Sequence, residues 1–110
     1  MVRSPEIVCL SGSTRFIDVM AVTAWELEKG GAIVLSCHLL PAWYTDAPDH
    51  LAEIQGCAEA MDALHLRKID MADRLHVINA DGYIGESCRR EIDYATSLGK
   101  PVTYLEKPHA

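Results

Sequence analysis

Four short apolar runs, separated by longer segments of helical character, constrain the fold of this chain more than any other feature. The runs cover residues 6–11, 32–37, 74–79 and 101–105, and Val, Ile and Leu dominate them. They are too apolar for strands of an antiparallel sheet that has one solvated face. Each run is therefore expected to be a buried strand of a parallel sheet.

The segments between these runs predict three helices. They extend over about 14–29, from Asp46 or Asp49 to about 71 with a weak point at Gly56, and over 86–98. Alternation of strand and helix predicts a single α/β domain over residues 1–110. We expect a flavodoxin-like or Rossmann-like three-layer sandwich. Its parallel sheet would have four or five strands in the order 2-1-3-4, with helices on both faces.

Segments that are polar or contain glycine follow three of the predicted strands, at residues 11–15, 38–43 and 79–87. Parallel sheets bind ligands at the carboxyl ends of their strands, where loop N–H groups and helix N-termini favour anions. We therefore expect one cleft at this edge of the sheet. Its candidate substrate-binding residues are Gly12, Ser13, Arg15, His38, Asn79, Gly85 and Ser87.

Several of these residues also have a purely structural interpretation. Ser13 or Thr14 can cap the first helix while Arg15 points to solvent, and His38 can hydrogen-bond its own loop. Trp43 and Tyr44, in the long loop that follows, fit a ligand-stacking surface and a cover for the core equally well. Both interpretations stay open at the level of the sequence.

Glu91 lies in the first or second turn of the helix predicted at 86–98, beside the same anion-binding corner. A glutamate near a helix N-terminus is favourable to the helix dipole and needs no function to explain it. Glu86 is nearer the end and already serves that purpose, whereas Glu91 shares a helical face with Ser87, four residues earlier. Glu91 is therefore a candidate for chemistry in the cleft.

Composition narrows the range of partners. Ten basic and sixteen acidic residues give a net charge of −6, which disfavours duplex nucleic acid, because binding it requires a basic surface. No apolar run approaches the ~20 residues that span a bilayer, and the first residues do not resemble a signal peptide. We expect a cytoplasmic protein without a membrane partner. The four cysteines are scattered and expected to be reduced, and neither a metal nor a cofactor is expected.

Further motifs extend these observations over most of the chain. They are Ser11-Gly-Ser-Thr-Arg15 after the first strand, His38 after the second, Ala72-Asp73 before the third, and Gly85 through Glu91-Ile-Asp-Tyr-Ala to Gly99-Lys-Pro101. Together they resemble the nucleoside 2-deoxyribosyltransferase superfamily. Within it, the first segment is closest to the 2′-deoxynucleoside 5′-monophosphate N-glycosidases.

This resemblance implies cleavage of the N-glycosidic bond of a nucleotide or nucleoside. By motif position, Glu91 matches the nucleophile that forms a covalent glycosyl-enzyme. Segment 12–15 matches the loop that binds the sugar and its 5′-phosphate, and Ser87 with the Gly85 backbone would complete the phosphate site. His38 matches a pocket residue near the base. Water as the acceptor gives a hydrolase that releases (deoxy)ribose 5-phosphate, and a second base as the acceptor gives a transferase.

The chain departs from the family at the residue that assists the leaving base or orients the sugar. The family commonly has an aspartate on the helix before the third strand, whereas counting without gaps puts His65 there and Asp62 one turn earlier. Either His65 or Asp62 takes the place of this aspartate by helix register, or the step that it assists is impaired. His65 also fits a buried histidine of the core. A non-catalytic nucleotide-binding module is therefore a further alternative. Members of the superfamily are often homodimers whose second chain closes the pocket, which implies a homodimer here.

Overall fold

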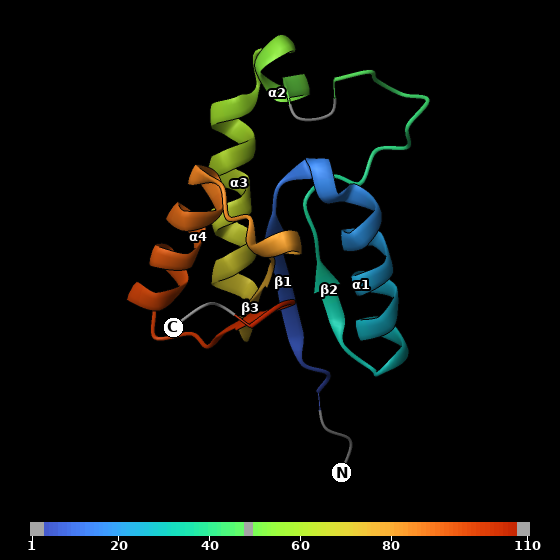
Figure 1. Ribbon diagram of the computed structural model, residues 1–110. Coiled ribbons are helices and arrows are strands. Elements are labelled where there is room, and N and C mark those ends of the chain that lie inside the picture. Colours follow the sequence, from blue (N-terminus) through green and yellow to red (C-terminus); the bar gives the residue numbers. More distant parts are fainter. Residues whose placement is uncertain (1–3, 48–49, 108–110) are drawn as a thin grey trace.

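A computed structural model describes residues 4–47 and 50–107 of the protein (Figure 1). The strands of this part of the chain are β1 (Ile7–Gly12), β2 (Ile33–Leu35), β3 (Arg74–Ile78) and β4 (Val102–Tyr104). They form one parallel sheet in the order β2-β1-β3-β4. The predicted α/β fold class and strand order are confirmed, with four strands rather than five in the described residues.

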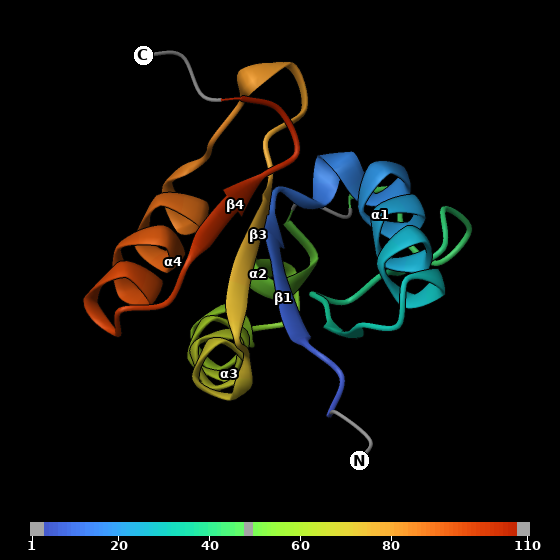
Figure 2. The same ribbon diagram turned by 90° about the horizontal axis from the view of Figure 1, so that it is seen from below.

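Helices cover both faces of this sheet (Figure 2). α1 (Ile17–Lys29) packs on one face, and α3 (Ala58–Met71) and α4 (Glu86–Ser97) pack on the other. The arrangement is the expected three-layer sandwich. No helix in the described part of the chain is long and apolar enough to cross a membrane.

The side chains of β1 alternate between two apolar clusters, one on each face. Val8 and Leu10 pack with Met20 of α1, whereas Cys9 packs on the opposite face with Ile69 of α3. All five side chains are almost completely buried. Full burial of one aliphatic side chain contributes about 1.5–3 kcal/mol, so the two clusters hold β1 and its carboxyl end firmly between the layers.

The second predicted helix is broken into two, so the single helix expected from Asp46 or Asp49 to about residue 71 is wrong. α2 (Leu51–Ile54) ends before Gly56, and α3 begins after it. Gly56 has a φ of +71°, a left-handed conformation that only glycine adopts readily. No side-chain cap precedes α2 among the described residues, and Asp49 lies outside them.

The first predicted helix starts as a 3-10 turn, η1 (Thr14–Phe16), before α1 begins. Ser13 Oγ accepts a hydrogen bond from Arg15 N at 3.2 Å, so Ser13 caps this turn. A second 3-10 turn, η3 (Ala80–Gly82), connects β3 to the loop before α4. Both turns lie at the carboxyl edge of the sheet, where the candidate residues gather.

β1 lies close against β3 at Gly12, with little room for a side chain. A Cβ atom at Gly12 would lie 3.0 Å from both the Cβ and the carbonyl oxygen of Ile78. Because the obstacle includes backbone, an added methyl group would displace β3 or the turn after β1.

We predict that Gly12→Ala lowers the free energy of unfolding by roughly 1–3 kcal/mol, measured by urea denaturation, because overpacking displaces the strand. Gly30→Ala is the matched control, since a Cβ there would meet its nearest atom, Leu27 O, at 3.4 Å. The control should change the free energy by no more than about 1 kcal/mol, in either direction. Equal losses in the two variants would contradict the close contact between β1 and β3.

Candidate active site

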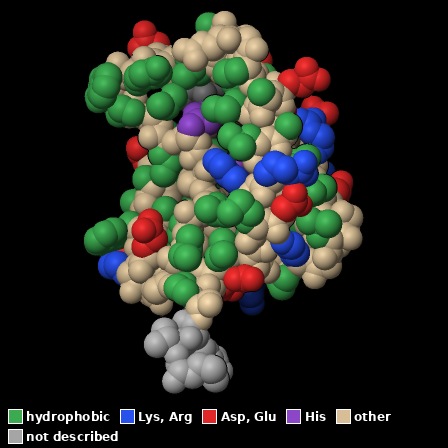
Figure 3. Space-filling view, turned by 180° about the vertical axis from the view of Figure 1, so that it is seen from behind, with side chains coloured by type: hydrophobic (Ala, Val, Ile, Leu, Met, Phe, Trp, Pro, Cys, Tyr) green, Lys and Arg blue, Asp and Glu red, His purple; other side chains and the backbone are tan. Residues whose placement is uncertain are grey.

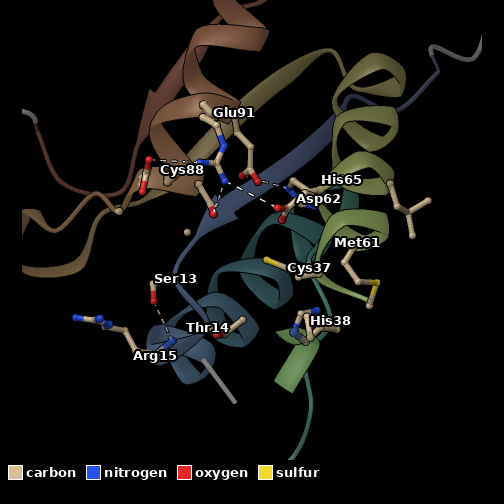
Figure 4. Close-up of a pocket in the computed structure, with 18 of the residues that line it drawn as sticks. Ser13, Thr14, Arg15, Cys37, His38, Met61, Asp62, His65, Cys88 and Glu91 are labelled. Carbon is tan, nitrogen blue, oxygen red and sulfur yellow. Dashed lines mark hydrogen bonds and ion pairs between the residues drawn. The ribbon is translucent and has the colours of Figure 1, made fainter. Parts of the chain in front are cut away.

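A cavity of about 630 Å³ opens at the carboxyl ends of β1 and β2 (Figure 4). The turn after β1, the residues after β2, α3 and the start of α4 form its walls. The structure brings nine predicted site residues to this cavity: Gly12, Ser13, Arg15, His38, Asp62, His65, Gly85, Ser87 and Glu91. The three polar segments therefore converge at one edge of the sheet.

Glu91 reaches from α4 to the carboxyl end of β1. Its side chain is 15 % exposed, and Oε1 accepts a hydrogen bond from Ser11 Oγ at 2.5 Å. Ser11 Oγ also lies 3.1 Å from Cys88 Sγ. A hydroxyl has one proton, and the carboxylate is the stronger acceptor, so Ser11 donates to Glu91. Both contacts of this carboxylate with the described residues, to Ser11 and to His65, are made by Oε1. Oε2 therefore has no partner among these residues and can contact a ligand.

His65 approaches the same carboxylate from α3. Its Nε2 lies 3.6 Å from Glu91 Oε1 and 2.9 Å from the carbonyl oxygen of Leu10. A carbonyl oxygen only accepts, so Nε2 carries a proton and donates it to Leu10. His65 is 7 % exposed. It is thus a buried histidine with a satisfied N–H, as the core interpretation expects, and it is also a neighbour of Glu91.

Burial raises the pKa of Glu91 above its ordinary value. The nearby His65 and the hydrogen bond from Ser11 act in the opposite direction, because both stabilise the ionised carboxylate. Asp62 adds to the rise, and Arg90 opposes it. A desolvated carboxyl with fixed polar partners in a cavity is typical of functional sites.

Asp62 lies at the exposed rim of the cavity rather than beside Glu91. Its Oδ2 is 3.9 Å from Arg90 Nη2, and Arg90 also lies 3.7 Å from Glu86 and donates to Ser87 Oγ at 3.2 Å. These contacts join α3 to the first turns of α4. Of the two residues considered for the position before the third strand, His65 therefore contacts the carboxylate and Asp62 does not.

The turn after β1 and the loop before α4 meet at one wall of the cavity, on the side away from His38. The guanidinium of Arg15 lies 4.3 Å from the ring centroid of Tyr83, a cation–π contact, and Phe16 packs edge-on against the same ring. Figure 4 shows Ser13 and Arg15 on this side of the cavity and His38 on the other. No side chain of the described residues caps α4 at Gly85, so its N-terminal N–H groups suit an anion.

Asn79 is the predicted site residue that the structure does not bring to the cavity, so its assignment to substrate binding is corrected. Its side chain is 2 % exposed. Nδ2 donates to the carbonyl oxygen of Glu106, and Oδ1 accepts from the Glu106 N–H, both at 2.9 Å. Both ends of the amide are therefore used to fasten the chain after β4.

Three residues that matter at the site were not named as candidates from the sequence. Ser11 contacts Glu91, and Tyr83 and Lys68 line the cavity. Lys68 follows His65 by three positions on one helix, and this i,i+3 spacing indicates that the two residues share a helical face. Ser11 belongs to the polar segment 11–15, but its contact with Glu91 depends on the packing of a distant helix.

The loop after β2 is rich in exposed apolar side chains. In the view from behind in Figure 3, hydrophobic side chains gather over this loop, and Lys and Arg side chains gather across α3. Trp43 is 84 % exposed and packs edge-on against Tyr44. Neither ring lines the cavity, and Trp43 covers little of the core.

The described residues, 4–47 and 50–107, contain no group of three or more His, Cys, Asp or Glu side chains placed to hold a metal ion. All four cysteines are free thiols. Comparison of the chain with protein-family models, curated proteins and solved structures gave no match. The chemistry of the cavity is therefore inferred from its own residues.

The raised pKa of Glu91 predicts a pH-dependent effect on stability. The protonated carboxyl favours the folded state, and this contribution is present below the pKa of the unfolded chain and lost as pH rises through the folded-state pKa. Glu91→Gln stays neutral, so it should raise the free energy of unfolding on the order of 1 kcal/mol at mildly alkaline pH. At acid pH the variant and the wild type should be nearly equal, as measured by urea denaturation.

Glu28→Gln serves as the control, because Glu28 is exposed on α1. It should change the free energy by no more than about 0.5 kcal/mol at either pH. A Glu91→Gln variant that is less stable than the wild type at alkaline pH would contradict this prediction. It would show that the contacts of Ser11 and His65 stabilise the ionised carboxylate by more than its burial destabilises it.

Proposed function

We propose that this protein hydrolyses the N-glycosidic bond of a nucleoside 5′-monophosphate and releases the free base and (deoxy)ribose 5-phosphate. The observation that carries the proposal is the position of Glu91, a largely buried carboxylate that shares one cavity with the anion-suited turn after β1. The resemblance of the motifs to the nucleoside 2-deoxyribosyltransferase superfamily agrees with this chemistry.

In this proposal Glu91 is the nucleophile. Its free oxygen, Oε2, bonds to C1′ of the sugar while the C1′–N bond breaks and its electron pair leaves with the base. The negative charge of the carboxylate stabilises the oxocarbenium character that develops on the sugar. Water then attacks C1′, which frees Glu91, gives the sugar a hydroxyl group and leaves a proton for the base.

Ser11 and His65 prepare this carboxylate without donating to the base. Ser11 holds Oε1 through its hydrogen bond, which fixes the direction of Oε2. The Nε2 proton of His65 is engaged by Leu10, so His65 stabilises the ionised carboxylate from 3.6 Å rather than acting as a proton donor. Both contacts oppose the effect of burial on the pKa of Glu91, and so favour the form that attacks.

The 5′-phosphate is assigned to the side of the cavity that holds Arg15. Guanidinium groups and helix N-termini both favour phosphate oxygens, and the N-terminus of α4 at Gly85 lies on the same cavity. Tyr83 already orients the Arg15 guanidinium, which lowers the entropy cost of binding.

We further infer a cytoplasmic homodimer. Met61 and Leu64 are exposed apolar residues of α3 that line the rim of the cavity, and Met71 extends the exposed apolar surface of this helix. A second copy packed on this surface would cover apolar side chains and close the rim. Sedimentation of the purified protein tests the oligomeric state.

A substrate screen separates the proposed function from its alternatives. The protein is incubated with the common nucleoside 5′-monophosphates, and released base is measured by chromatography. Release in water alone supports the hydrolase. Base exchange with an added second base, and preference for unphosphorylated nucleosides, would select a deoxyribosyltransferase. Binding without release from any nucleotide, unaltered by Glu91→Ala, would select a non-catalytic binding module.

Glu91→Gln should lower kcat by about 10⁴-fold or more while leaving nucleotide affinity within a few-fold, because the covalent route is lost and the shape of the side chain is kept. Base release and equilibrium binding measure the two quantities. Asp93→Asn is the matched control, since Asp93 lies on the same helix, is exposed and does not line the cavity. Full activity of Glu91→Gln would exclude Glu91 as the nucleophile.

Arg15→Ala should weaken binding of the phosphorylated substrate by about 2–3 kcal/mol, the size of a charge-assisted contact. The unphosphorylated nucleoside should be affected much less. Arg89→Ala, an exposed arginine of α4 outside the cavity, is the control for net charge. Equal losses for the two substrates after Arg15→Ala would show that Arg15 does not bind the phosphate.

A further inference from the structure

The side of the cavity away from Arg15 carries a lysine that the proposed mechanism has not used. Figure 4 shows Cys37 and His38 on this side. Lys68 of α3 lines the same cavity and is half-buried, and its Nζ donates to the carbonyl oxygen of Ser36 at 2.6 Å. The hydrogen bond holds the ammonium at the end of β2, next to Cys37 and His38.

The charge of Lys68 has no carboxylate partner in residues 4–47 and 50–107. The other cations of the cavity are engaged, Arg90 by two carboxylates and Arg15 by an aromatic ring. An ammonium has three N–H donors and no acceptor, and Ser36 uses one of them. A half-buried cation with free donors is suited to an oxygen-bearing ligand, because buried charges are normally paired.

The field of this ammonium extends into the site. Burial, followed by the charge of Glu91, raises the pKa of the Cys37 thiol to about 11, and Lys68 acts in the opposite direction. Burial raises the pKa of the Cys9 thiol to about 12. There too the charge of Glu91 raises the pKa and the charge of Lys68 lowers it. Lys68 and Glu91 therefore act on the same groups, through a part of the protein where charges are screened less than at the surface.

Cleavage of an N-glycosidic bond also requires stabilisation of the departing base. Nε2 of His65 does not serve this purpose, because its proton is engaged by Leu10. Asp62 lies at the exposed rim beside Arg90. Lys68 is one helical turn beyond His65 on the wall of the same cavity, so it can reach a base whose sugar is bound at Glu91.

We propose that Lys68 binds a carbonyl oxygen of the nucleobase and stabilises the base as it leaves as an anion. This inference rests on the proposed function. When Glu91 bonds to C1′, the electron pair of the C1′–N bond moves to the base and delocalises onto its carbonyl oxygen, where a Lys68 N–H donates. The base later takes the proton released when water hydrolyses the glycosyl–Glu91 ester, and Lys68 remains protonated throughout.

The chemistry of an ammonium selects the class of base. It donates and cannot accept, so it favours bases that carry a conjugated carbonyl oxygen, such as uracil, thymine, hypoxanthine and guanine. Adenine carries no carbonyl oxygen. The substrate class is therefore the 5′-monophosphate of an oxo-bearing nucleobase.

The experiment compares base release from the nucleotides of uracil, 5-fluorouracil and adenine by wild type, Lys68→Met, Lys68→Arg and Lys29→Met. Lys68→Met should lower kcat for the uracil nucleotide by about 10²-fold, the typical effect of removing one donor from a developing negative charge. The loss should be smaller for 5-fluorouracil, whose anion is intrinsically more stable, and smallest for adenine. Lys68→Arg should recover part of the rate, and Lys29→Met, an exposed control on α1, should not differ from wild type.

Equal losses on all three nucleotides after Lys68→Met would overturn the inference and make Lys68 a residue that only holds the end of β2. The wild-type enzyme provides a second measurement if this variant does not fold. A wild-type rate that rises steeply from uracil to 5-fluorouracil would mean that the base leaves without stabilisation, which also overturns it. Release from the adenine nucleotide alone would reject this inference and keep the proposed function. No release from any nucleotide would reject both.

Discussion

The hydrogen bond from Ser11 to Glu91 is the contact on which the arrangement of the cavity depends. It joins β1 to α4 and fixes one oxygen of a carboxylate that lines the cavity. The contact exists because β1 is held on both faces by apolar clusters. At Gly12 the same strand packs so closely against β3 that an added Cβ would lie 3.0 Å from the Ile78 backbone.

The carboxylate is placed at a cost to stability. Burial raises the pKa of Glu91, whereas the hydroxyl of Ser11 and the nearby His65 favour its ionised form. The balance places this carboxyl in a partly dry site, where no Lys or Arg among residues 4–47 and 50–107 forms an ion pair with it. A group of this kind is expected at a functional site, where stability and activity make opposite demands.

The position of α3 matters as much as that of α4, because α3 carries both His65 and Lys68. Lys100 Nζ holds the end of this helix by donating to three carbonyl oxygens, of Ile69, Asp70 and Ala72, at 2.7–2.9 Å. A cation at this end is favourable to the helix dipole and satisfies carbonyl groups that have no partner within the helix. The Gly-Lys-Pro segment before β4 thereby supports the wall of the cavity from the opposite end of the sheet.

Much of this architecture followed from local pattern. Four apolar runs separated by helical segments were enough to give the parallel sheet, its strand order and the edge where polar residues gather. The break at Gly56 was underestimated, because a glycine lowers helix stability by only about 1 kcal/mol and packing decides whether the helix continues. Asn79 was assigned to the cavity, but a polar residue at a strand end can instead bind a neighbouring segment of the same chain. Its two hydrogen bonds to Glu106 depend on where β4 ends.

Helical periodicity and the motif spacing identified Glu91, and they placed it with Ser87 on one helical face. They did not identify its partners. Ser11 is 80 positions away, and the orientation of His65 and Lys68 depends on how α3 rotates against the sheet. Periodicity relates residues within one helix or strand, whereas contacts between elements are set by how all the buried side chains pack together. For that reason a single carboxylate could be read from the pattern of residues, and the polar groups around it became visible only when the layers were assembled.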